Sequence, residues 1–347
     1  MKTSPFQVAI VLAAALCVSA CATTAVGTDA TASADSADDA QVSLDAAAVD
    51  GAPSDALTAD PKQLTVMTFN VMCSFCKNSE FPQWQQEWKV RLPMTKQTIA
   101  RHDPDLIGVQ ELSRLVSETH EIDDLTQPEN IYGEVSYHFN ANDAMTDLGK
   151  AFEQDYPDAT ILYRKTRFDV LAQGQFWLSP TPDTAFSFGF AKNGGSFFRL
   201  VVWAKLHDKV ANRDMYFATT HFDNNSPSQE LSAPLALQRF EPKAKELPVI
   251  FIGDFNSTPA NKAYVILNKG VDGKGFSFAN AFDLAKNWSI TTNRQPVPAY
   301  DLTQRIDHFW LAGAEFSVPW FKVDLWGYGA NMQKPSDHDA MIAAIRW

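Results

Sequence analysis

The sequence predicts an α/β domain in which two packed β-sheets are flanked by helices. Between Leu64 and Trp347 short apolar runs alternate with amphipathic stretches, and no repeat or second linker interrupts them. Apolar residues make up 45% of the chain and charged residues 20%, which provides enough apolar side chains for one large core. Because many short strands with interspersed helices suit two packed sheets, we expect residues 62–347 to form a single domain.

Residues 1–20 are predicted to be a signal peptide. Lys2 precedes an apolar run from Phe6 to Val18 that is too short to span a bilayer, and small residues follow it. The tetrapeptide Val-Ser-Ala-Cys that ends at Cys21 resembles the lipobox of bacterial lipoproteins, which implies lipidation of Cys21. An ordinary secretory signal cleaved nearby is the alternative. Both interpretations place the protein outside the cytoplasm, and lipidation would tether it to a membrane of the bacterial cell envelope, which we expect to be the outer membrane.

Residues 21–61 are predicted to form a disordered acidic tether. The segment is mostly Ala, Thr, Ser and Asp, so it cannot bury enough apolar surface to offset the entropy of ordering. Eight Asp residues and Lys2 within residues 1–60 account for −7 of the net charge of −12. The domain is therefore only mildly acidic. This argues against tight non-specific binding of duplex nucleic acid but leaves room for a nuclease whose bound cation supplies positive charge.

Two of the four cysteines belong to the predicted signal region, and the other two form a Cys-x-x-Cys motif. Cys17 lies in the apolar run and Cys21 at the expected lipidation site, which leaves Cys73 and Cys76. Disulfides persist in exported proteins, so we expect a local disulfide between these two. Two free thiols or a redox motif are the alternatives, although no thioredoxin-like pattern of strand and helix surrounds the motif.

Segments rich in β-branched and aromatic residues predict the strands, and amphipathic stretches predict the helices. The expected strands are Leu64–Met72, Asp105–Gln110, Thr160–Tyr163, Phe168–Trp177, Leu200–Leu206, Met215–Thr220, Val249–Gly253, Arg305–Leu311, Phe316–Asp324 and Ala340–Ile345. The expected helices are Trp84–Arg101, Pro234–Glu246 and Pro259–Leu267. Strands thus outnumber helices, as two sheets in one domain require.

Polar residues stand at the ends of most of these strands. The segments are Thr68-Phe69-Asn70, Gly108-Val109-Gln110-Glu111, Thr219-Thr220-His221, Gly253-Asp254-Phe255-Asn256, Ile306-Asp307-His308 and Ser336-Asp337-His338. Any one of them is a weak signal, because an acid after a strand is usually a helix cap or turn residue. Together they predict one pocket, because strand ends on one edge of a sheet lie close together and α/β enzymes place their chemistry there.

The residue types in this predicted pocket suit hydrolysis of a phosphate ester. Carboxylate and amide oxygens are the ligands of a hard cation such as Mg²⁺ or Mn²⁺, whereas a zinc site would need more His or Cys. Two histidines beside such a cation fit general acid and base catalysis near neutral pH. The cation would draw charge from the phosphoryl oxygens while a base activates water.

In this order and with these spacings, the six segments resemble the endonuclease/exonuclease/phosphatase superfamily. Its members include DNase I-like nucleases, abasic-site endonucleases, deadenylases, inositol-phosphate phosphatases and neutral sphingomyelinases. The resemblance covers the chain from about Leu64 to the C-terminus, and the Gly253–Asn256 and Ser336–His338 segments are its most specific part. It implies a four-layer α/β sandwich.

The resemblance also implies roles for the polar residues. Glu111 matches the metal-binding Glu, and Asn70 and Asp337 are expected close to the same Mg²⁺ or Mn²⁺ ion. Asp254 and Asn256 match the pair that orients the attacking water and holds the phosphate.

The remaining implied roles concern two histidines and their neighbours. His338 matches the catalytic histidine, and Asp307 the carboxylate that orients and charges it. His221 matches a second histidine that contacts the scissile phosphate. Arg199 and Tyr163 resemble phosphate-contacting positions, although Arg199 could instead be a solvated residue at a strand start and Tyr163 a core residue.

Two segments depart from the family pattern. His308 and Phe309 replace the aromatic and aliphatic residues that usually follow the Asp, and Asp339 stands where an apolar residue or Pro is commoner. Neither change removes a catalytic group. An added acid beside the metal could, however, alter cation affinity or the basicity of His338.

Two enzymatic functions remain open at this point. The first is a nuclease or other phosphodiesterase that acts on nucleic acid outside the cytoplasm. The second is a lipid-directed phosphoesterase of the sphingomyelinase or phosphoinositide phosphatase type, which an anchor in a membrane would suit. An exposed apolar hairpin would favour the second. Residues 181–195, with alternating Phe186, Phe188 and Phe190, could supply one, although such alternation is more often a half-buried strand.

A binding lipoprotein without catalytic activity is a third hypothesis, from a different functional class. It would be expected to have lost at least one catalytic group, and none is lost in the sequence. The expected partners are the phosphate-ester substrate, nucleic acid or phospholipid, and the membrane reached through the lipid anchor. The sequence indicates no obligate protein partner.

Overall fold

A computed structural model describes residues 60–73, 87–112, 121–137, 158–190 and 198–347. The predicted signal peptide, the lipidation site Cys21, nearly all of the predicted tether and Cys76 lie outside these residues. Among the described residues, no helix has both the length and the apolar character needed to cross a bilayer. The described residues thus belong almost wholly to the predicted domain.

Within the described residues, the first sheet has seven strands in the order β10-β12-β13-β1-β2-β4-β3. Its strands are β1 (Leu64–Asn70), β2 (Leu106–Gln110), β3 (Tyr132–Val135), β4 (Ala159–Arg164), β10 (Trp288–Thr291), β12 (Ser317–Asp324) and β13 (Met341–Arg346). β1 and β2 are parallel, whereas β13 and β4, on either side of this pair, run antiparallel to it. The edge at which β1 and β2 end is therefore the edge at which β4 and β13 begin.

The second sheet repeats this arrangement with six strands in the described part of the chain, in the order β5-β6-β7-β8-β11-β9. Its strands are β5 (Phe168–Trp177), β6 (Leu200–Asp208), β7 (Arg213–His221), β8 (Val249–Asp254), β9 (Ala279–Asn280) and β11 (Asp307–Ala312). β7 and β8 are parallel, and β6 and β11 flank them in the opposite direction. Two strands again end, and two begin, at one edge.

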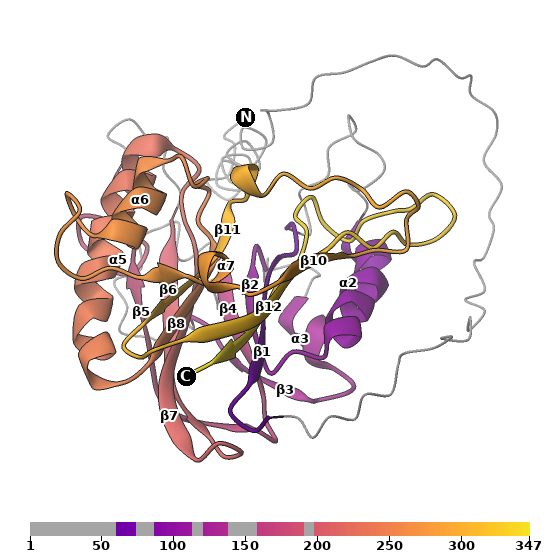
Figure 1. The fold of residues 1–347 in the computed structure, drawn as a ribbon, viewed down its shortest axis with the longest axis horizontal. Helices are drawn as coiled ribbons and strands as arrows, with labels where there is room; N and C mark the ends of the chain where they lie inside the picture. The colour runs from indigo at the N-terminus through magenta and orange to yellow at the C-terminus, as the bar shows by residue number, and fades with distance from the viewer. Residues whose placement is uncertain (1–59, 74–86, 113–120, 138–157, 191–197) are drawn as a thin grey trace, which may run out of the picture.

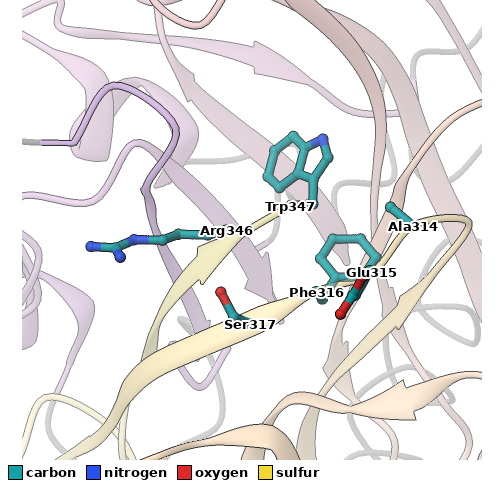
Figure 2. Close-up of a pocket in the computed structure, with 6 residues that line it drawn as sticks. All are labelled: Ala314, Glu315, Phe316, Ser317, Arg346 and Trp347. Atoms are coloured by element: carbon teal, nitrogen blue, oxygen red, sulfur yellow. The ribbon is translucent and has the colours of Figure 1, made fainter.

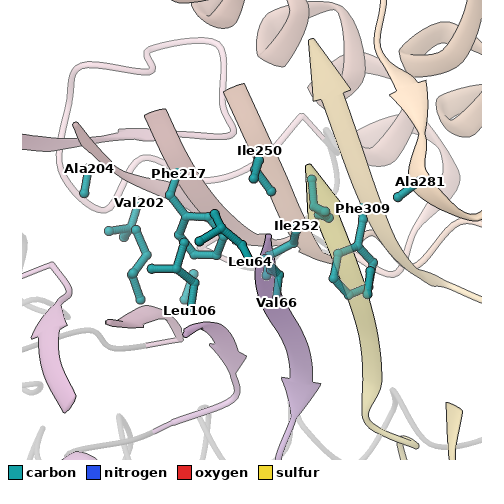
Figure 3. Packing of buried hydrophobic residues seen from close by; sticks show 14 of the residues in the cluster. Leu64, Val66, Leu106, Val202, Ala204, Phe217, Ile250, Ile252, Ala281 and Phe309 are labelled. Atoms are coloured by element: carbon teal, nitrogen blue, oxygen red, sulfur yellow. The ribbon is translucent and has the colours of Figure 1, made fainter. Parts of the chain in front are cut away.

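The two sheets pack face to face. Val66 and Leu106 of the first sheet share one buried apolar cluster with Val202, Phe217 and Ile252 of the second (Figure 3). Because helices also cover the outer faces, a central strand such as β8 is buried along its whole length. Such strands appear in the sequence as unbroken apolar runs instead of alternating ones.

Helices cover the outer face of each sheet (Figure 1). They are α2 (Trp88–His102), α3 (Glu121–Thr126), α5 (Ser226–Glu246) and α6 (Lys262–Lys269). The short helix α7 (Ala281–Leu284) and a 3₁₀ helix at Leu302–Gln304 instead contribute to the apolar cluster between the sheets. Apolar residues of α5 and α6 pack on the second sheet, and those of α2 and α3 on the first. The order helix, sheet, sheet, helix confirms the predicted four-layer α/β sandwich.

The prediction that a helix begins at Pro234 is wrong, because α5 begins at Ser226. The side chain of Asn225 accepts a hydrogen bond from the backbone N–H of Ser228 at 3.2 Å and caps the helix. Pro227 occupies the first turn, where its missing N–H costs no helical hydrogen bond. Pro234 lies inside the helix, and buried residues on both sides of it keep the helix packed on the sheet. Tertiary packing thus overrides the local preference of proline for a helix start.

Several short elements are absent from the sequence-based prediction. β3 and β10 have four residues each and β9 has two. β10 is largely exposed at the edge of its sheet, and α3 has only six residues. Elements this short contain too few apolar residues for a periodic pattern to emerge.

The Phe-rich segment after β5 contains no strand over its described part, residues 178–190. Phe186 is buried with a left-handed φ of 54°, whereas Phe188 is 53% exposed. The Phe188 ring stacks on Phe198, with 4.2 Å between ring centroids. The alternation of phenylalanines therefore belongs to an irregular segment and not to a half-buried strand, and residues 191–195 lie outside the described part.

Candidate active site

The strands bring nearly all the predicted site residues to one edge that both sheets share. Strands β1, β2, β7 and β8 end at this edge, whereas β4, β6, β11 and β13 begin there. The residues at or next to these strand ends are Asn70, Glu111, Asp158, Arg199, His221, Asp254, Asn256, Asp307, Asp337 and His338. Mixed strand direction thus allows polar residues both before and after strands to meet.

Asn70 joins the two sheets at this edge. Its Nδ2 donates hydrogen bonds to Oε1 of Glu111 (2.9 Å) and to Oδ2 of Asp254 (3.1 Å). Backbone N–H groups complete the arrangement: Met72 donates to Oδ1 of Asn70 (3.0 Å), and Cys73 to Oε2 of Glu111 (2.9 Å). The side chains expected near the metal are therefore held by a fixed set of donors.

The donor set fits a divalent cation. Asp337 is exposed at the surface, but desolvation by its neighbours raises its pKa, and the negative charge of Glu111 raises it further, although His338 lowers it. A cation would favour the ionised form of Asp337, and carboxylate oxygens suit Mg²⁺ or Mn²⁺. Ligand atoms of Asp254, Asp307 and His338 also lie within 4.8 Å of one another. Because Asp307 and His338 are hydrogen-bonded to each other, we assign that pair to proton chemistry instead.

His338, which is partly buried, pairs with the buried Asp307. Nδ1 of His338 lies 2.9 Å from Oδ2 of Asp307, and Oδ1 of Asp307 has no hydrogen-bond partner among the described residues. Burial raises the pKa of Asp307 to about 6, although His338 opposes the rise. Burial lowers the pKa of His338, but Asp307 and Asp254 outweigh it and raise the pKa well above its usual value. The pair therefore favours a protonated imidazole at neutral pH.

Asp254 lies between the two imidazoles. Its Oδ2 is 3.4 Å from Nε2 of His221 and 3.6 Å from Nε2 of His338. Its Oδ1 accepts a hydrogen bond from the backbone N–H of Asn256 at 2.8 Å. Burial raises the pKa of Asp254, but the two histidines and the hydrogen bonds from Asn256 and Asn70 outweigh it and lower the pKa. Asp254 is thus an ionised carboxylate with hydrogen-bond donors on both oxygens.

Asp158 completes the site and was not found from the sequence. Nδ1 of His221 lies 3.0 Å from Oδ1 of Asp158, and Nη1 of Arg199 lies 2.7 Å from its Oδ2 and 2.6 Å from Nδ1 of His221. Burial raises the pKa of Asp158, but Arg199 and His221 outweigh it and hold it far below its usual value. Burial and Arg199 lower the pKa of His221, whereas Asp158 and Asp254 raise it, and the net shift is upward.

The position of Asp158 explains why it escaped prediction. It precedes β4, and an Asp before a strand resembles an ordinary turn residue. The signal that could have found it is the antiparallel direction of β4, because such a strand offers its first residues to the edge where its parallel neighbours end.

Tyr163 does not join the other site residues. Ala159 of β4 pairs with Gln110 beside the site, whereas Tyr163 pairs with Leu106 at the opposite end of the strands. A Cβ placed on Gly133 would lie 2.4 Å from the Tyr163 ring, so this ring packs closely over Gly133. The structure thus contradicts the expected phosphate contact of Tyr163, and its alternative role in packing agrees with its position.

Two residues that depart from the family pattern, His308 and Asp339, each bind a neighbouring group. Nε2 of His308 donates to the carbonyl of Ser257 at 2.7 Å, and burial lowers the pKa of His308 to about 3, so this ring is neutral. Lys334 pairs with Asp339 at 2.8 Å. Cys73 is disulfide-bonded, whereas Cys76, its predicted partner, lies outside the described residues.

A surface hollow of about 440 Å³ lies away from this edge (Figure 2). It is lined by Ala314, Glu315, Phe316, Ser317, Arg346 and Trp347. β13 begins beside the site and ends at Arg346, so this hollow lies at the opposite end of the sheet. It is not part of the candidate active site.

The family model for the endonuclease/exonuclease/phosphatase family matches residues 67–338, a range that includes every residue of the site. The chain belongs to this family. Among curated proteins, no match to the chain is found. Membership agrees with the site, because the family's members hydrolyse phosphate esters and the residues gathered here are acids, amides and histidines.

Solved structures share the fold of this family member. An endonuclease/exonuclease/phosphatase from Bacteroides vulgatus has 23% identity and a TM-score of 0.62, with 82% of this chain and 98% of that chain covered. A mannosyl-6-phosphatase from Bacteroides thetaiotaomicron has the same identity and TM-score, with 82% and 100% covered. TDP2 from D. rerio, complexed with a single-strand DNA product, has 16% identity and a TM-score of 0.57, with 82% and 99% covered.

Proposed function

We propose that this chain is a divalent-metal-dependent phosphoesterase that hydrolyses phosphodiesters. The observation that carries the proposal is the position of Asp254. Its ionised carboxylate lies between the imidazoles of His221 and His338 and is linked through Asn70 to Glu111. A base, two imidazoles and a cation site in one cluster are the groups that metal-assisted phosphoryl transfer requires.

Glu111 and Asp337, with Asn70 beside them, would hold Mg²⁺ or Mn²⁺. When bound, such an ion supplies positive charge to the phosphoryl oxygens. The donors already fixed on Glu111 and Asn70 orient these side chains before any cation arrives.

The chain's own residues supply the proton chemistry. Asp254 is ionised and accepts a hydrogen bond from the attacking water, whose proton it can take. His338, kept protonated by Asp307, directs Nε2–H toward the same space and donates to a phosphoryl oxygen. His221 presents its Nε2 from the other side of Asp254, with its Nδ1 fixed between Asp158 and Arg199.

Flexible phosphodiesters fit the charge of this protein better than duplex nucleic acid does. The domain is mildly acidic outside the predicted tether, so its affinity for a duplex backbone would be weak. The TDP2 structure, which holds a single-strand DNA product, supports a diester substrate by analogy of fold. A sugar-phosphate monoester is the second candidate, supported by the similarity to a mannosyl-6-phosphatase.

A lipid substrate is supported by one observation. Phe188 is 53% exposed and stacks on Phe198, which directly precedes Arg199 of the site. An exposed aromatic beside the site could contact an apolar substrate group.

We also propose export and anchoring through Cys21 on the basis of the signal-like N-terminus. A Cys21→Ser variant should move from the membrane fraction to the soluble envelope fraction.

The function is tested with purified protein, Mg²⁺ or Mn²⁺, and a panel of phosphate esters, each repeated with a chelator. The panel contains a chromogenic diester, single-stranded DNA, RNA, a hexose 6-phosphate and sphingomyelin vesicles. We expect chelator-sensitive turnover of a diester. Turnover of the hexose phosphate alone would favour the second candidate, and no turnover of any ester would reject the proposal.

A matched pair of variants tests the site. His338→Gln should lower kcat by about 10²–10⁴-fold. His207→Gln is the control, because Nδ1 of His207 pairs with Oδ1 of Asp214 at 2.7 Å near the other end of β6. Its turnover should equal that of the wild type. Full activity of His338→Gln would reject the assignment.

A further inference from the structure

Arg91 of α2 is a completely buried arginine, with 0% of its surface exposed. Arginine is rarely buried in this way, because its guanidinium has to exchange water for hydrogen-bond acceptors of the protein. The guanidinium donates to the carbonyl oxygens of Val71, Met72, Cys73 and Pro335. The bonds to Met72, Cys73 and Pro335 measure 2.9, 3.1 and 3.0 Å.

These carbonyl groups belong to the two segments that carry the expected metal-binding residues. Val71, Met72 and Cys73 directly follow Asn70 at the end of β1. Pro335 precedes Ser336 and Asp337 and lies 244 positions from Arg91 in the sequence. The hydroxyl of Ser336 also donates to the carbonyl of Asn70 at 2.7 Å. Arg91 therefore fastens together two distant segments at the point where they form the site.

The same peptide groups that bind Arg91 also bind the expected metal ligands. The peptide between Val71 and Met72 presents its carbonyl to Arg91 and its N–H to Oδ1 of Asn70. The peptide between Met72 and Cys73 presents its carbonyl to Arg91 and its N–H to Oε2 of Glu111. In a planar trans peptide the two groups point in opposite directions, so fixing one fixes the other. Each peptide thus transmits the position of Arg91 to a side chain of the cation site.

The backbone conformation of residues 71–73 makes this segment depend on the hydrogen bonds from Arg91. Met72 has a left-handed φ of 59°, which a residue with a long side chain adopts only at a cost in free energy. Hydrogen bonds from a charged donor are stronger than those between neutral groups, and chained hydrogen bonds polarise each other. The guanidinium therefore both stabilises the unusual turn and strengthens the N–H groups that face Asn70 and Glu111.

We propose that Arg91 is a positioning residue for the divalent cation: it holds Asn70, Glu111 and Asp337 in the arrangement that binds the ion. The inference rests on the proposed metal-dependent function. Arg91 itself does not contact the substrate or the ion. Its positive charge interacts most strongly with Glu121 of α3 and also with Asp337 and Glu111, so it offsets the repulsion between the last two before the ion binds.

Arg167 provides a matched control for a purely structural role. Its surface is 9% exposed, and it donates to the carbonyl of Pro61 at 2.9 Å and pairs with Asp208 at 2.9 Å and Asp105 at 3.1 Å. It directly precedes β5 and lies at the end of the second sheet opposite the site. Loss of the Arg167 guanidinium should destabilise the fold without altering the cation site.

The test compares Arg91→Lys and Arg167→Lys in the full chain. Mn²⁺ binding is measured directly by calorimetry and by electron paramagnetic resonance, and Mg²⁺ dependence by turnover of the diester. Arg91→Lys should raise the Kd for Mn²⁺ by about 10–100-fold, the range typical for residues that orient metal ligands. Its turnover should approach the wild-type value at high Mg²⁺ concentration. Arg167→Lys should leave the Kd unchanged while lowering the Tm.

Each outcome is informative. A folded Arg91→Lys with wild-type affinity for Mn²⁺ would overturn the inference and leave the proposed function intact. A wild-type protein that binds no Mn²⁺ would instead reject the metal-dependent function on which the inference rests. If Arg91→Lys does not fold, Arg91→Gln is measured at a temperature where its circular dichroism equals that of the wild type. Wild-type affinity in that variant would equally overturn the inference.

Discussion

Nδ1 of His338 lies 2.9 Å from Oδ2 of Asp307, and this contact sets the charge of the histidine. Asp307→Asn removes the strongest influence that raises the pKa of His338, so that pKa should fall. If the protonated ring is the active form, activity is lost as pH rises through this pKa. The alkaline limb of the kcat/KM profile, recorded at saturating Mg²⁺, should therefore move to lower pH in the variant.

Asp214→Asn is the control for this profile, because Asp214 pairs with His207 far from the site. The alkaline limb of the Asp214→Asn profile should coincide with that of the wild type. An unchanged limb in Asp307→Asn, with uniformly reduced activity, would show that Asp307 does not act through the charge of His338.

Asp158→Asn should lower the unfolding free energy and make that free energy depend less on pH in the acid range. Arg199 and His221 depress the pKa of Asp158 although burial opposes this. The carboxylate therefore stabilises the fold above the unfolded pKa of about 3.9, and this stabilisation is lost as pH falls through the folded pKa. At pH 7 the variant should lose about 3–5 kcal/mol of unfolding free energy, because Arg199 loses a buried charged partner.

Urea denaturation between pH 3 and pH 7 measures this effect. Asp169→Asn serves as the comparison, because Asp169 pairs with Lys209 on the surface at 2.9 Å with 58% of its side chain exposed. The loss of unfolding free energy in Asp169→Asn should stay below about 1 kcal/mol. Parallel curves for Asp158→Asn and the wild type would contradict the expected linkage.

Cation binding should stabilise the fold, and Glu111→Gln should abolish this effect. A cation at about 100 times its Kd adds about 2.7 kcal/mol to the unfolding free energy of a protein that binds it only when folded. Glu111→Gln removes one negative ligand, so the rise in Tm with Mg²⁺ should disappear and chelator should have no effect. Glu246→Gln, an exposed partner of Lys205, should keep the full rise. Equal rises in both variants would exclude Glu111 as a ligand.

Gly253→Ala should disturb Asp254, the next residue along β8. Gly253 has φ of 143°, and a Cβ there would lie 2.1 Å from the backbone carbonyl oxygen of Thr220 in the paired strand β7. We expect a loss of about 3 kcal/mol or more, together with reduced turnover. Gly273→Ala is the control, because Gly273 has φ of 73° and nothing lies within 4 Å of the added Cβ. This variant measures the cost of alanine at a positive φ without a steric clash. Similar stability of the two variants would show that β7 and β8 can separate without cost.

Much of the fold could be predicted because its central strands are buried on both faces. β8 and β13 appear in the sequence as unbroken apolar runs, which identify strands without any knowledge of their partners. β9 and β10 could not be predicted, because they are short and lie at the sheet edges. The start of α5 was misplaced because Pro234 is tolerated only through the packing of the helix on the sheet.

The site could be predicted wherever its residues stand in characteristic motifs, such as Gly253–Asn256. The exceptions depend on strand direction. Asp158 directly precedes β4 and Tyr163 lies near the other end of that strand. Only the antiparallel pairing of β4 with β2 determines that the first lies beside the site and the second far from it. Direction is a property of tertiary pairing, which local sequence does not encode. Arg91 escaped for a similar reason, because its partners are carbonyl groups, which every residue possesses.

The hydrogen bonds of Asn70 also constrain the order of events during folding. They reach partners 41, 184 and 266 positions away, at Glu111, Asp254 and Ser336. Contacts of such long sequence separation form late, because large loops must close first. We expect a nascent chain to assemble this cluster only after Ser336 has been synthesised. The recovery of hydrolytic activity during refolding should therefore lag behind the recovery of secondary structure. Partly folded chains should not hydrolyse phosphate esters.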